Sequence, residues 1–321
     1  MSFRIAGVGS ALADLTVDNF SFEKILDTSD EWITTRTGIK TRNFITQNSL
    51  TYLAATASKN ALDDAGLSED DLDLIIAATL QGDYIMPSLA CLVQKELNAS
   101  CPAFDLNAAC TGFLYALDLA DAYFKAGKAK NILIVCADQM SKFLDFSDRS
   151  TCVLFGDAAG AAVLTQGSAL KYIEITAQGE YKNLHIESSK NYIPFAKNRK
   201  KSDQGCLKMN GQNIFKFAVS TVTQDIKKAL QKTSLKSDDI KYYLIHQANK
   251  RILETAQSFL GESSHKFPTN LQRLGNTSAA SIPILLDELK NKDKLYNGDL
   301  LVLCAFGGGM TAGTAITEWS Y

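Results

Sequence analysis

The chain has 321 residues, of which 46% are hydrophobic, and its formal net charge at pH 7 is −2. This apolar content is enough for a large buried core and excludes a disordered chain. The charge balance shows no basic excess of the kind that nucleic-acid binding produces, so we expect no nucleic-acid partner. The length fits one large domain or two halves of ordinary domain size.

The amino-terminal residues lack a basic stretch followed by a long apolar run, so we expect no signal peptide. The longest apolar runs are too short to span a membrane, which predicts no membrane partner. The seven cysteines form an odd set without a CxxC pair. We therefore expect reduced thiols, a cytoplasmic location and no metal site.

An internal repeat with an offset of 168 residues runs through the chain. The motif that begins at Leu67 returns at Leu235, and the apolar run 132–137 returns at 300–305. In each half a helical pattern, over 50–65 and 214–231, precedes the motif, and an apolar run, over 74–78 and 242–246, follows it. We interpret this as a duplication with halves 1–170 and 171–321; convergent α/β patterning is the alternative.

Short apolar runs alternate with helical patterns within each half, which is typical of an α/β fold with buried strands. One such helix should follow Cys110 and end at Gly127. Two halves packed by pseudo-twofold symmetry would place two sheets face to face around shared helices, as a five-layer αβαβα sandwich. Residues 180–213 interrupt the pattern, and their basic run at 197–201 indicates a solvated loop or a contact for an acidic partner.

Cys110 lies where an extended segment ends and a helix is expected to begin. Unpaired N–H groups and the positive end of a helix dipole favour a thiolate there, and the thiolate is the nucleophilic form of cysteine. The small residues Ala108, Ala109 and Gly112 leave room for a substrate. The alternative role for Cys110, and the one we expect for the other six cysteines, is that of a small buried core residue.

His246 follows the predicted strand 242–245, at a strand end where α/β sheets carry their functional residues. The repeat makes Ala78 its counterpart, so the second half would carry a polar group where the first half has a methyl. Asn276 follows Gly275 and precedes small residues that permit close approach, although a turn or helix cap is its simpler role. The glycines 307–309 follow a strand and can aim backbone N–H groups at an oxyanion.

Cys, His and Asn in this order also occur in papain-like hydrolases, and the spacing between Cys110 and His246 fits that class. The residues around Cys110 do not, because Cys-Thr-Gly-Phe replaces the expected Trp and no Cys-Gly precedes it. A non-catalytic acyl- or CoA-binding module is a third class, which an inert residue at position 110 would favour. The residues alone therefore indicate an acyl-transfer enzyme with a cysteine nucleophile.

Over its whole length the chain resembles the 3-oxoacyl-[acyl-carrier-protein] synthase III family, the initiating condensing enzymes of bacterial fatty acid synthesis. The resemblance lies in six stretches in family order, at 27–39, 108–113, 155–162, 246–249, 275–280 and 306–309. It implies a thiolase-like fold, a homodimer and the catalytic residues Cys110, His246 and Asn276. It also implies an oxyanion hole formed by the N–H groups of Cys110 and Gly308.

The same resemblance implies a reaction and its partners. An acyl-CoA starter, usually acetyl-CoA in this family, would acylate Cys110, and malonyl-acyl carrier protein would then lose CO2 and condense with the acyl group without any cofactor. Met86 stands where many relatives carry a Phe that borders the partner subunit's acyl pocket, so the starter specificity can differ. Residues implied to hold CoA are Thr28, Trp32, Arg36, Arg149, Gly211, Phe215, Ala248 and Asn249, and those implied near the carrier protein are Lys216 and Arg251.

Overall fold

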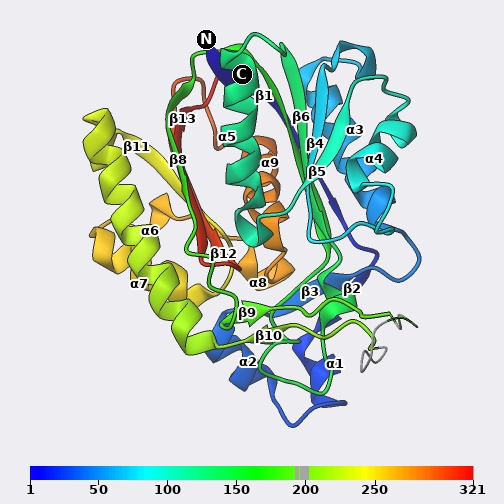
Figure 1. The fold of residues 1–321 in the computed structure, drawn as a ribbon. Helices are drawn as coiled ribbons and strands as arrows, with labels where there is room; N and C mark the ends of the chain where they lie inside the picture. Colours follow the sequence, from blue (N-terminus) through cyan, green and yellow to red (C-terminus); the bar gives the residue numbers. More distant parts are fainter. Residues whose placement is uncertain (192–194, 196–201, 321) are drawn as a thin grey trace.

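The computed structural model describes residues 1–191, 195 and 202–320. The basic run at 197–201 lies outside these residues, so its role stays a prediction. Two β-sheets lie face to face, and helices fill the space between them and cover both outer faces (Figure 1). The five layers therefore run helix, sheet, helix, sheet, helix, as the sequence predicted.

The first sheet has five strands in the order β1-β7-β6-β4-β5. The three strands β6, β4 and β5 run parallel, whereas β7 is antiparallel to both of its neighbours. Their bounds are Ser2–Leu12 for β1, Leu74–Ala78 for β4, Ala103–Leu106 for β5, Asn131–Asp138 for β6 and Ala158–Gly167 for β7.

The second sheet has four strands in the order β11-β12-β13-β8, with bounds Leu170–Thr176 for β8, Ile240–Ile245 for β11, Leu300–Gly307 for β12 and Thr311–Glu318 for β13. Its order repeats that of β4-β6-β7-β1, and β11 is parallel to β12 as β4 is to β6. We infer that the two sheets descend from one duplicated unit. Two short pairs complete the strands: β2 (Leu15–Asp18) with β3 (Thr41–Phe44), and β9 (Leu184–His185) with β10 (Lys208–Met209).

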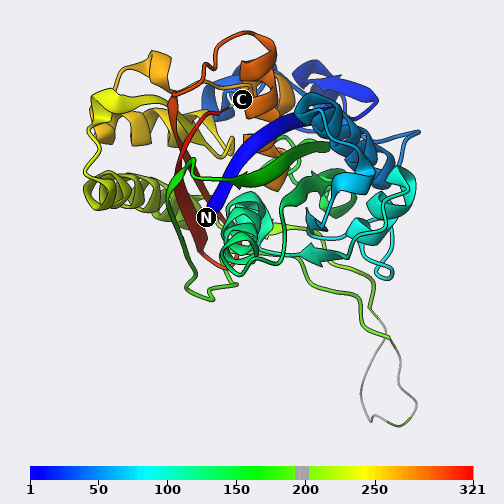
Figure 2. The same cartoon turned by 90° about the horizontal axis from the view of Figure 1, so that it is seen from above.

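The helices form three layers, as the view from above also shows (Figure 2). Helices α3 (Leu50–Ala65) and α4 (Leu89–Leu97) cover the outer face of the first sheet, and α6 (Gly211–Thr233) and α7 (Lys250–Leu260) that of the second. Helices α5 (Gly112–Lys125) and α9 (Ser281–Asn291) lie between the sheets and contact both. The short helices α1 (Asn19–Glu23), α2 (Asp30–Thr37) and α8 (Leu271–Leu274) lie near the carboxyl ends of the central strands (Figure 1).

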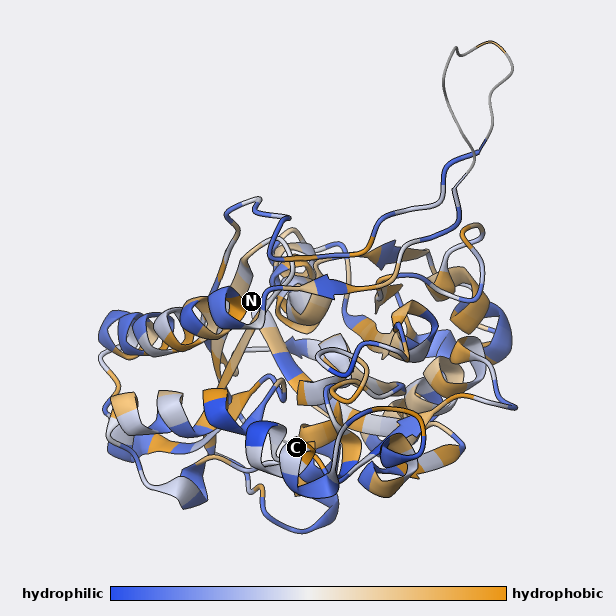
Figure 3. Cartoon of the chain, turned by 90° about the horizontal axis from the view of Figure 1, so that it is seen from below, coloured by the Kyte–Doolittle hydropathy of each residue, from blue (hydrophilic) through white to orange (hydrophobic). Residues whose placement is uncertain are grey.

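Hydrophobic residues concentrate in the strands and in the central helices, while hydrophobic and hydrophilic residues alternate along the outer helices (Figure 3). This matches the burial pattern, because every residue of β4 is buried whereas α6 buries one stripe. The predicted boundaries of α3 are those observed, since Ser49 caps its start and Gly66, with a φ of 65°, ends it. No helix in the described part of the chain is both long and apolar enough to cross a bilayer.

The sheet register corrects one prediction. Ala78 pairs with Cys136 on β6, and Ile245 pairs with Cys304 on β12. The counterpart of His246 is therefore Thr79 and not Ala78. From the repeated motif to this strand end, the second half is one residue shorter than the first. The first half thus also carries a polar side chain at this position.

Candidate active site

Cys110 lies between the two sheets, in a short 3₁₀ turn at Ala109–Thr111 that leads directly into α5. The turn begins with Ala109 at a φ of 48°, an unusual angle for a residue with a side chain. The sequence placed a helix start at or just after this cysteine, and the structure confirms that placement. The turn holds Cys110 at the start of a central helix, at the bottom of two pockets.

The electrostatics at Cys110 differ from the expectation. Burial raises the pKa of its thiol to about 12, and the hydrogen bond from the Ser278 hydroxyl, whose Oγ lies 3.6 Å from Sγ, only partly opposes this. The helix start lowers the pKa of the thiol, but burial, which removes solvent from the sulfur, raises it by more. At neutral pH the resting side chain is a thiol, and its proton has to be removed when it attacks.

His246 follows the last residue of β11 and is 1% exposed. Its N–H donates to the carbonyl of Cys304 at 2.8 Å, so the strand pairing fixes its backbone. Its ring packs edge-on against Phe306, with ring centres 5.4 Å apart. Burial lowers the pKa of the imidazole to about 3, so the ring is neutral at physiological pH and acts through hydrogen bonds.

Ser281, at the start of α9, orients this ring and was missed by the sequence reasoning. Its Oγ lies 2.7 Å from His246 Nδ1 and accepts the backbone N–H of Gln247 at 3.3 Å. Oγ can accept from Gln247 and donate its own hydrogen to Nδ1 at the same time, and this is the arrangement in which Nδ1 is an acceptor. The proton of the neutral ring then lies on Nε2, which becomes a donor. Only packing between α9 and β11, far apart in sequence, creates this contact.

Hydrogen bonds of both the backbone and the side chain hold Asn276 in place. Its N–H donates to Leu154 O at 2.8 Å, and its carbonyl accepts from Gly156 N at 3.0 Å. Its Oδ1 accepts the N–H of Ser278 at 2.9 Å, which leaves the amide Nδ2 as the donor toward the pocket. The preceding Gly275 has a φ of 65°, which confirms the unusual backbone angle that the sequence predicted.

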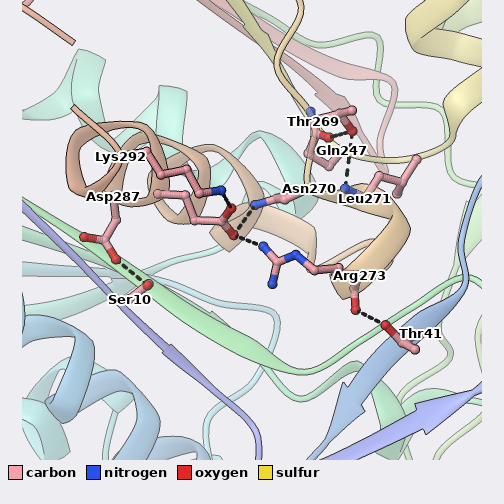
Figure 4. Close-up of polar contacts among 10 residues, drawn as sticks. Ser10, Thr41, Gln247, Thr269, Asn270, Leu271, Arg273, Asp287 and Lys292 are labelled. Atoms are coloured by element: carbon pink, nitrogen blue, oxygen red, sulfur yellow. Dashed lines mark hydrogen bonds and ion pairs between the residues drawn. The ribbon is translucent and has the colours of Figure 1, made fainter. Parts of the chain in front are cut away.

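The segment before Asn276 is tied to the segment after His246 (Figure 4). Thr269 Oγ1 donates to Gln247 Oε1 at 2.6 Å, and Thr41 Oγ1 donates to the carbonyl of Arg273 at 2.8 Å. Arg273 Nη2 also binds Glu288 Oε1 at 2.7 Å, which joins this segment to α9. These contacts fix the spacing of His246 and Asn276, which a pocket for one oxygen atom requires.

The glycine turn after β12 packs against Cys110. A Cβ at Gly307 would lie only 2.9 Å from the backbone N of Cys110, so this position admits only glycine. A Cβ at Gly308 would lie 3.5 Å from that of Ala109, so Gly308 also faces the 3₁₀ turn. Cys110 and Gly308, the two residues of the predicted oxyanion hole, line the same pocket.

Two pockets meet at Cys110. The first, of about 410 Å³, contains Cys110, His246 and Asn276 and opens past Arg36 and Arg251. The second, of about 360 Å³, begins at Cys110 and Gly308 and is lined mainly by apolar side chains: Leu80, Met140, Phe143, Phe155, Leu184, Ile186 and Leu207. Two parts of a long substrate, or two substrates in turn, can therefore reach the sulfur from different sides.

The residues predicted to hold CoA divide into two groups. Arg36, Gly211, Phe215, Ala248 and Asn249 line the first pocket. Trp32 and Arg149 lie near its mouth, because the guanidinium groups of Arg36 and Arg149 lie 4.5 and 5.0 Å from the Trp32 ring. Thr28 Oγ1 is buried and has no hydrogen-bond partner among the described residues. Arg149 also pairs with Asp27, at 3.2 Å between Nη1 and Oδ2. The mouth thus combines positive charge with an aromatic face, which suits a nucleotide.

The remaining predicted residues lie outside the pockets or at their rim. Arg251 lines the first pocket and lies over the Phe215 ring, 5.7 Å from its centre, while Lys216 is exposed on α6 and lines neither pocket. Met86 also lines neither pocket and is 85% exposed. Within the described residues no group of three or more His, Cys, Asp or Glu side chains has the arrangement of a metal site.

Comparisons with known proteins identify the family of the chain. Two family models match the chain: 3-oxoacyl-[acyl-carrier-protein (ACP)] synthase III over residues 104–179, and the C-terminal model of the same family over 230–319. The beta-ketoacyl-[acyl-carrier-protein] synthase III of Aquifex aeolicus is 43% identical over 320 residues, which cover 99% of this chain and all of that relative. That of Clostridium acetobutylicum is 42% identical over 325 residues, with 99% of each chain covered.

Solved structures give the same result. The beta-ketoacyl-[acyl-carrier-protein] synthase III of Thermus thermophilus matches with a TM-score of 0.91 at 36% sequence identity, and 99% of each chain is covered. Sequence and fold therefore agree along the full length of the chain, including the segments that carry Cys110, His246 and Asn276. The chain belongs to the 3-oxoacyl-[acyl-carrier-protein] synthase III family of acyltransferases, whose thiolase-like fold it shares.

Proposed function

We propose that Cys110, His246 and Asn276 carry out the condensation that initiates fatty acid synthesis in this β-ketoacyl-[acyl-carrier-protein] synthase III. The substrates of the family are an acyl-CoA and malonyl-acyl carrier protein. The observation that supports these roles best is the meeting of one thiol with two hydrogen-bond donors, His246 Nε2 and Asn276 Nδ2, at the junction of two pockets.

In the first half-reaction Cys110 Sγ attacks the starter thioester and CoA leaves. The N–H groups of Cys110 and Gly308 stabilise the oxyanion, because they are fixed before the charge develops. CoA lies in the first pocket, with its nucleotide near Trp32 and the two arginines. The acyl chain extends into the second, apolar pocket.

In the second half-reaction malonyl-acyl carrier protein enters through the first pocket and loses CO2. His246 Nε2–H and Asn276 Nδ2–H donate to the oxygen of the resulting thioester enolate. The enolate carbon then attacks the acyl-Cys110 carbonyl, which gives the 3-oxoacyl product and expels the Cys110 thiolate, and the thiolate takes up a proton from solvent. Both donors are neutral and fixed, so they stabilise the charge mainly as it forms.

A panel of acyl-CoA starters with malonyl-acyl carrier protein tests this proposal. We expect acyl transfer to Cys110 and release of one CO2 per condensation, with acetyl-CoA accepted. The apolar second pocket should also admit longer or branched acyl chains. We therefore expect kcat/KM not to fall sharply for starters with acyl chains longer than two carbons. An enzyme that hydrolyses acyl-CoA without condensing it would contradict the proposal.

Arg251 and Lys216 are proposed to bind the acidic carrier protein. They lie on neighbouring helices, α7 and α6, and Arg251 lines the first pocket. We expect Lys216→Glu to raise KM for malonyl-acyl carrier protein about tenfold at low salt and less at high salt, because rim charges act through association. Lys216 lines neither pocket, so self-acylation by acyl-CoA should not change.

Arg251→Glu should weaken use of the carrier at least as much, with a smaller effect on self-acylation because Arg251 also lines the pocket. Lys95→Glu, on α4 in the opposite outer layer, is the matched control and should leave both half-reactions unchanged. If KM for malonyl-acyl carrier protein is the same in all three variants, the docking surface lies elsewhere, and residues 197–201 are the next candidate. Steady-state kinetics in carrier concentration at two salt concentrations measures this.

We also propose a homodimer. The side chains of Tyr84, Ile85 and Met86 are 60%, 87% and 85% exposed and form a run of apolar residues at the surface. Such a run is expected at an interface between subunits. In the dimer Met86 of the partner subunit would border the second pocket and set its length. Sedimentation of the wild type and of Ile85→Glu, which should be monomeric, tests this.

Ser281→Ala should slow malonyl decarboxylation about tenfold without changing self-acylation, because one hydrogen bond that fixes the His246 tautomer is lost. The ¹⁵N chemical shifts of His246 should change from the Nε2–H form to a mixture. Ser58→Ala removes a hydroxyl equally buried in α3 and is the control. An unchanged tautomer in Ser281→Ala would remove this role.

A further inference from the structure

The proton of Cys110 needs an acceptor that the roles of His246 and Asn276 do not supply. The thiol is protonated in the resting enzyme, because burial raises its pKa to about 12. His246 binds Ser281 through Nδ1, and its Nε2 already carries a proton in the tautomer derived above. The side chain that hydrogen-bonds the sulfur is instead that of Ser278, at 3.6 Å between Oγ and Sγ.

A buried carboxyl group lies beyond Ser278. Asp138 is the last residue of β6 and is 1% exposed. Its Oδ1 accepts from the N–H of Leu80 at 2.7 Å and from Thr79 Oγ1 at 3.2 Å. Its Oδ2 is equally buried and, among the described residues, has no hydrogen-bond partner. An unpaired buried carboxyl oxygen is costly, which calls for a donor that reaches it in some state of the enzyme.

The turn that carries Ser278 packs against β6, whose last residue is Asp138, so the Ser278 hydroxyl lies near this carboxyl. It interacts with the Asp138 carboxyl, where it opposes the effect of burial on the carboxyl pKa. With its hydrogen toward Cys110, as in the bond to Sγ, Asp138 Oδ2 is left unpaired. Rotation about the Ser278 Cβ–Oγ bond turns the hydrogen to Oδ2 and frees an Oγ lone pair for the thiol hydrogen. Ser278 can therefore connect the two groups.

Resting on the proposed function, we propose that Asp138 takes up the proton of Cys110 through the Ser278 hydroxyl when the starter acylates the enzyme. As Sγ bonds to the thioester carbon, the S–H proton moves to Ser278 Oγ and the Ser278 hydroxyl proton moves to Asp138 Oδ2. When the bond to the CoA sulfur breaks, the proton returns through Ser278 to the departing thiolate. Asp138 is again a carboxylate, so the step is balanced.

The charges around Asp138 suit this role. Burial raises the pKa of the carboxyl to about 6, and Lys142, on the 3₁₀ turn Met140–Phe143, opposes the rise. The other titratable groups that interact with it are the thiols of Cys110 and of Cys136 on its own strand. Within the described residues, Thr79, which follows β4, and Ser278, in the turn Ser278–Ala280, contribute hydroxyl groups and no charge. Asp138 is thus ionised at neutral pH, with a pKa near the operating pH as a base requires.

Asp138→Asn tests the proposal, since its Oδ1 can keep the bond to Leu80. We expect self-acylation to slow by about 10²–10⁴-fold at pH 7. The wild-type rate should fall as the pH drops below about 6, where the carboxyl is protonated. In Asp138→Asn this acid limb should disappear and the rate should rise with pH as the thiol ionises to solvent. Ser278→Ala should show the same two changes.

Malonyl decarboxylation without a starter is the second measurement, because it removes no proton from Cys110. It should stay within about threefold of the wild-type rate in Asp138→Asn, the reverse of the pattern expected for His246→Ala. Lys142→Met should move the acid limb of acylation to higher pH with an unchanged plateau, since a positive charge that lowers the pKa of Asp138 is lost.

Three results would overturn the proposal: acylation at the wild-type rate in Asp138→Asn, an acid limb that survives in it, or equal losses of acylation and decarboxylation in both Asp138→Asn and Ser278→Ala. The last result would make Asp138 a structural residue only. Failure of the wild type to form acyl-Cys110 would contradict the proposed function instead, so the two failures are distinct.

Discussion

Cys110→Ser should abolish both self-acylation and condensation, by on the order of 10⁴-fold or more in rate. The sulfur lies at the junction of the two pockets and beside the glycine turn that is proposed to supply the second oxyanion N–H. A serine hydroxyl in the same place is a much weaker acid than a thiol, so its alkoxide is not accessible. The mass of the intact protein after exposure to acyl-CoA measures this, because each acyl group adds its own mass.

The other partly exposed cysteines provide the controls. Cys91 and Cys206 are accessible to reagents but line neither pocket. Cys91→Ser and Cys206→Ser should therefore become acylated as the wild type does. Acyl transfer to either of them in the Cys110→Ser protein would show that the nucleophile has been assigned to the wrong residue.

His246→Ala and Asn276→Ala should each lose about 10²–10³ in the rate of malonyl decarboxylation, equal to about 2.7–4 kcal/mol. Each variant removes one of the two donors proposed for the enolate oxygen. Self-acylation uses the backbone oxyanion hole and should change much less. Release of CO2 from malonyl-acyl carrier protein and acyl transfer from acyl-CoA, measured separately, distinguish the two effects.

Asn276→Asp sharpens this test, because it keeps the shape of the side chain and replaces the donor by a negative charge. It should decarboxylate more slowly than Asn276→Ala, since a carboxylate repels the developing enolate. The pH dependence gives a further check: with a His246 pKa of about 3, the ring is neutral between pH 5 and 9. Decarboxylation should therefore not slow through protonation of His246 in that range. Decarboxylation at the wild-type rate in His246→Ala or Asn276→Ala would contradict the roles proposed for these two side chains.

Local patterns predicted the secondary structure well. The observed α3 and β4 have the predicted bounds, because Ser49 and Gly66 cap the helix and every residue of the strand is apolar. The repeat placed two equivalent sheets in one register, apart from the single residue that makes Thr79 the counterpart of His246. The sequence did not reveal this one-residue difference in length, because it falls between two matching segments, where there is no pattern to align.

The sequence by itself determined the layered α/β fold, the placement of Cys110 at a helix start and of His246 at a strand end, and the family. These follow from periodicity and from short motifs, which depend on neighbours in the chain. The tertiary structure decided which groups surround them: Ser281 against His246, and Ser278 and Asp138 behind Cys110. It also decided the protonation states, because the pKa of Cys110 rises and that of His246 falls through burial between two sheets. Burial and contacts between residues 35 or more positions apart depend on how the layers pack, which no local pattern encodes.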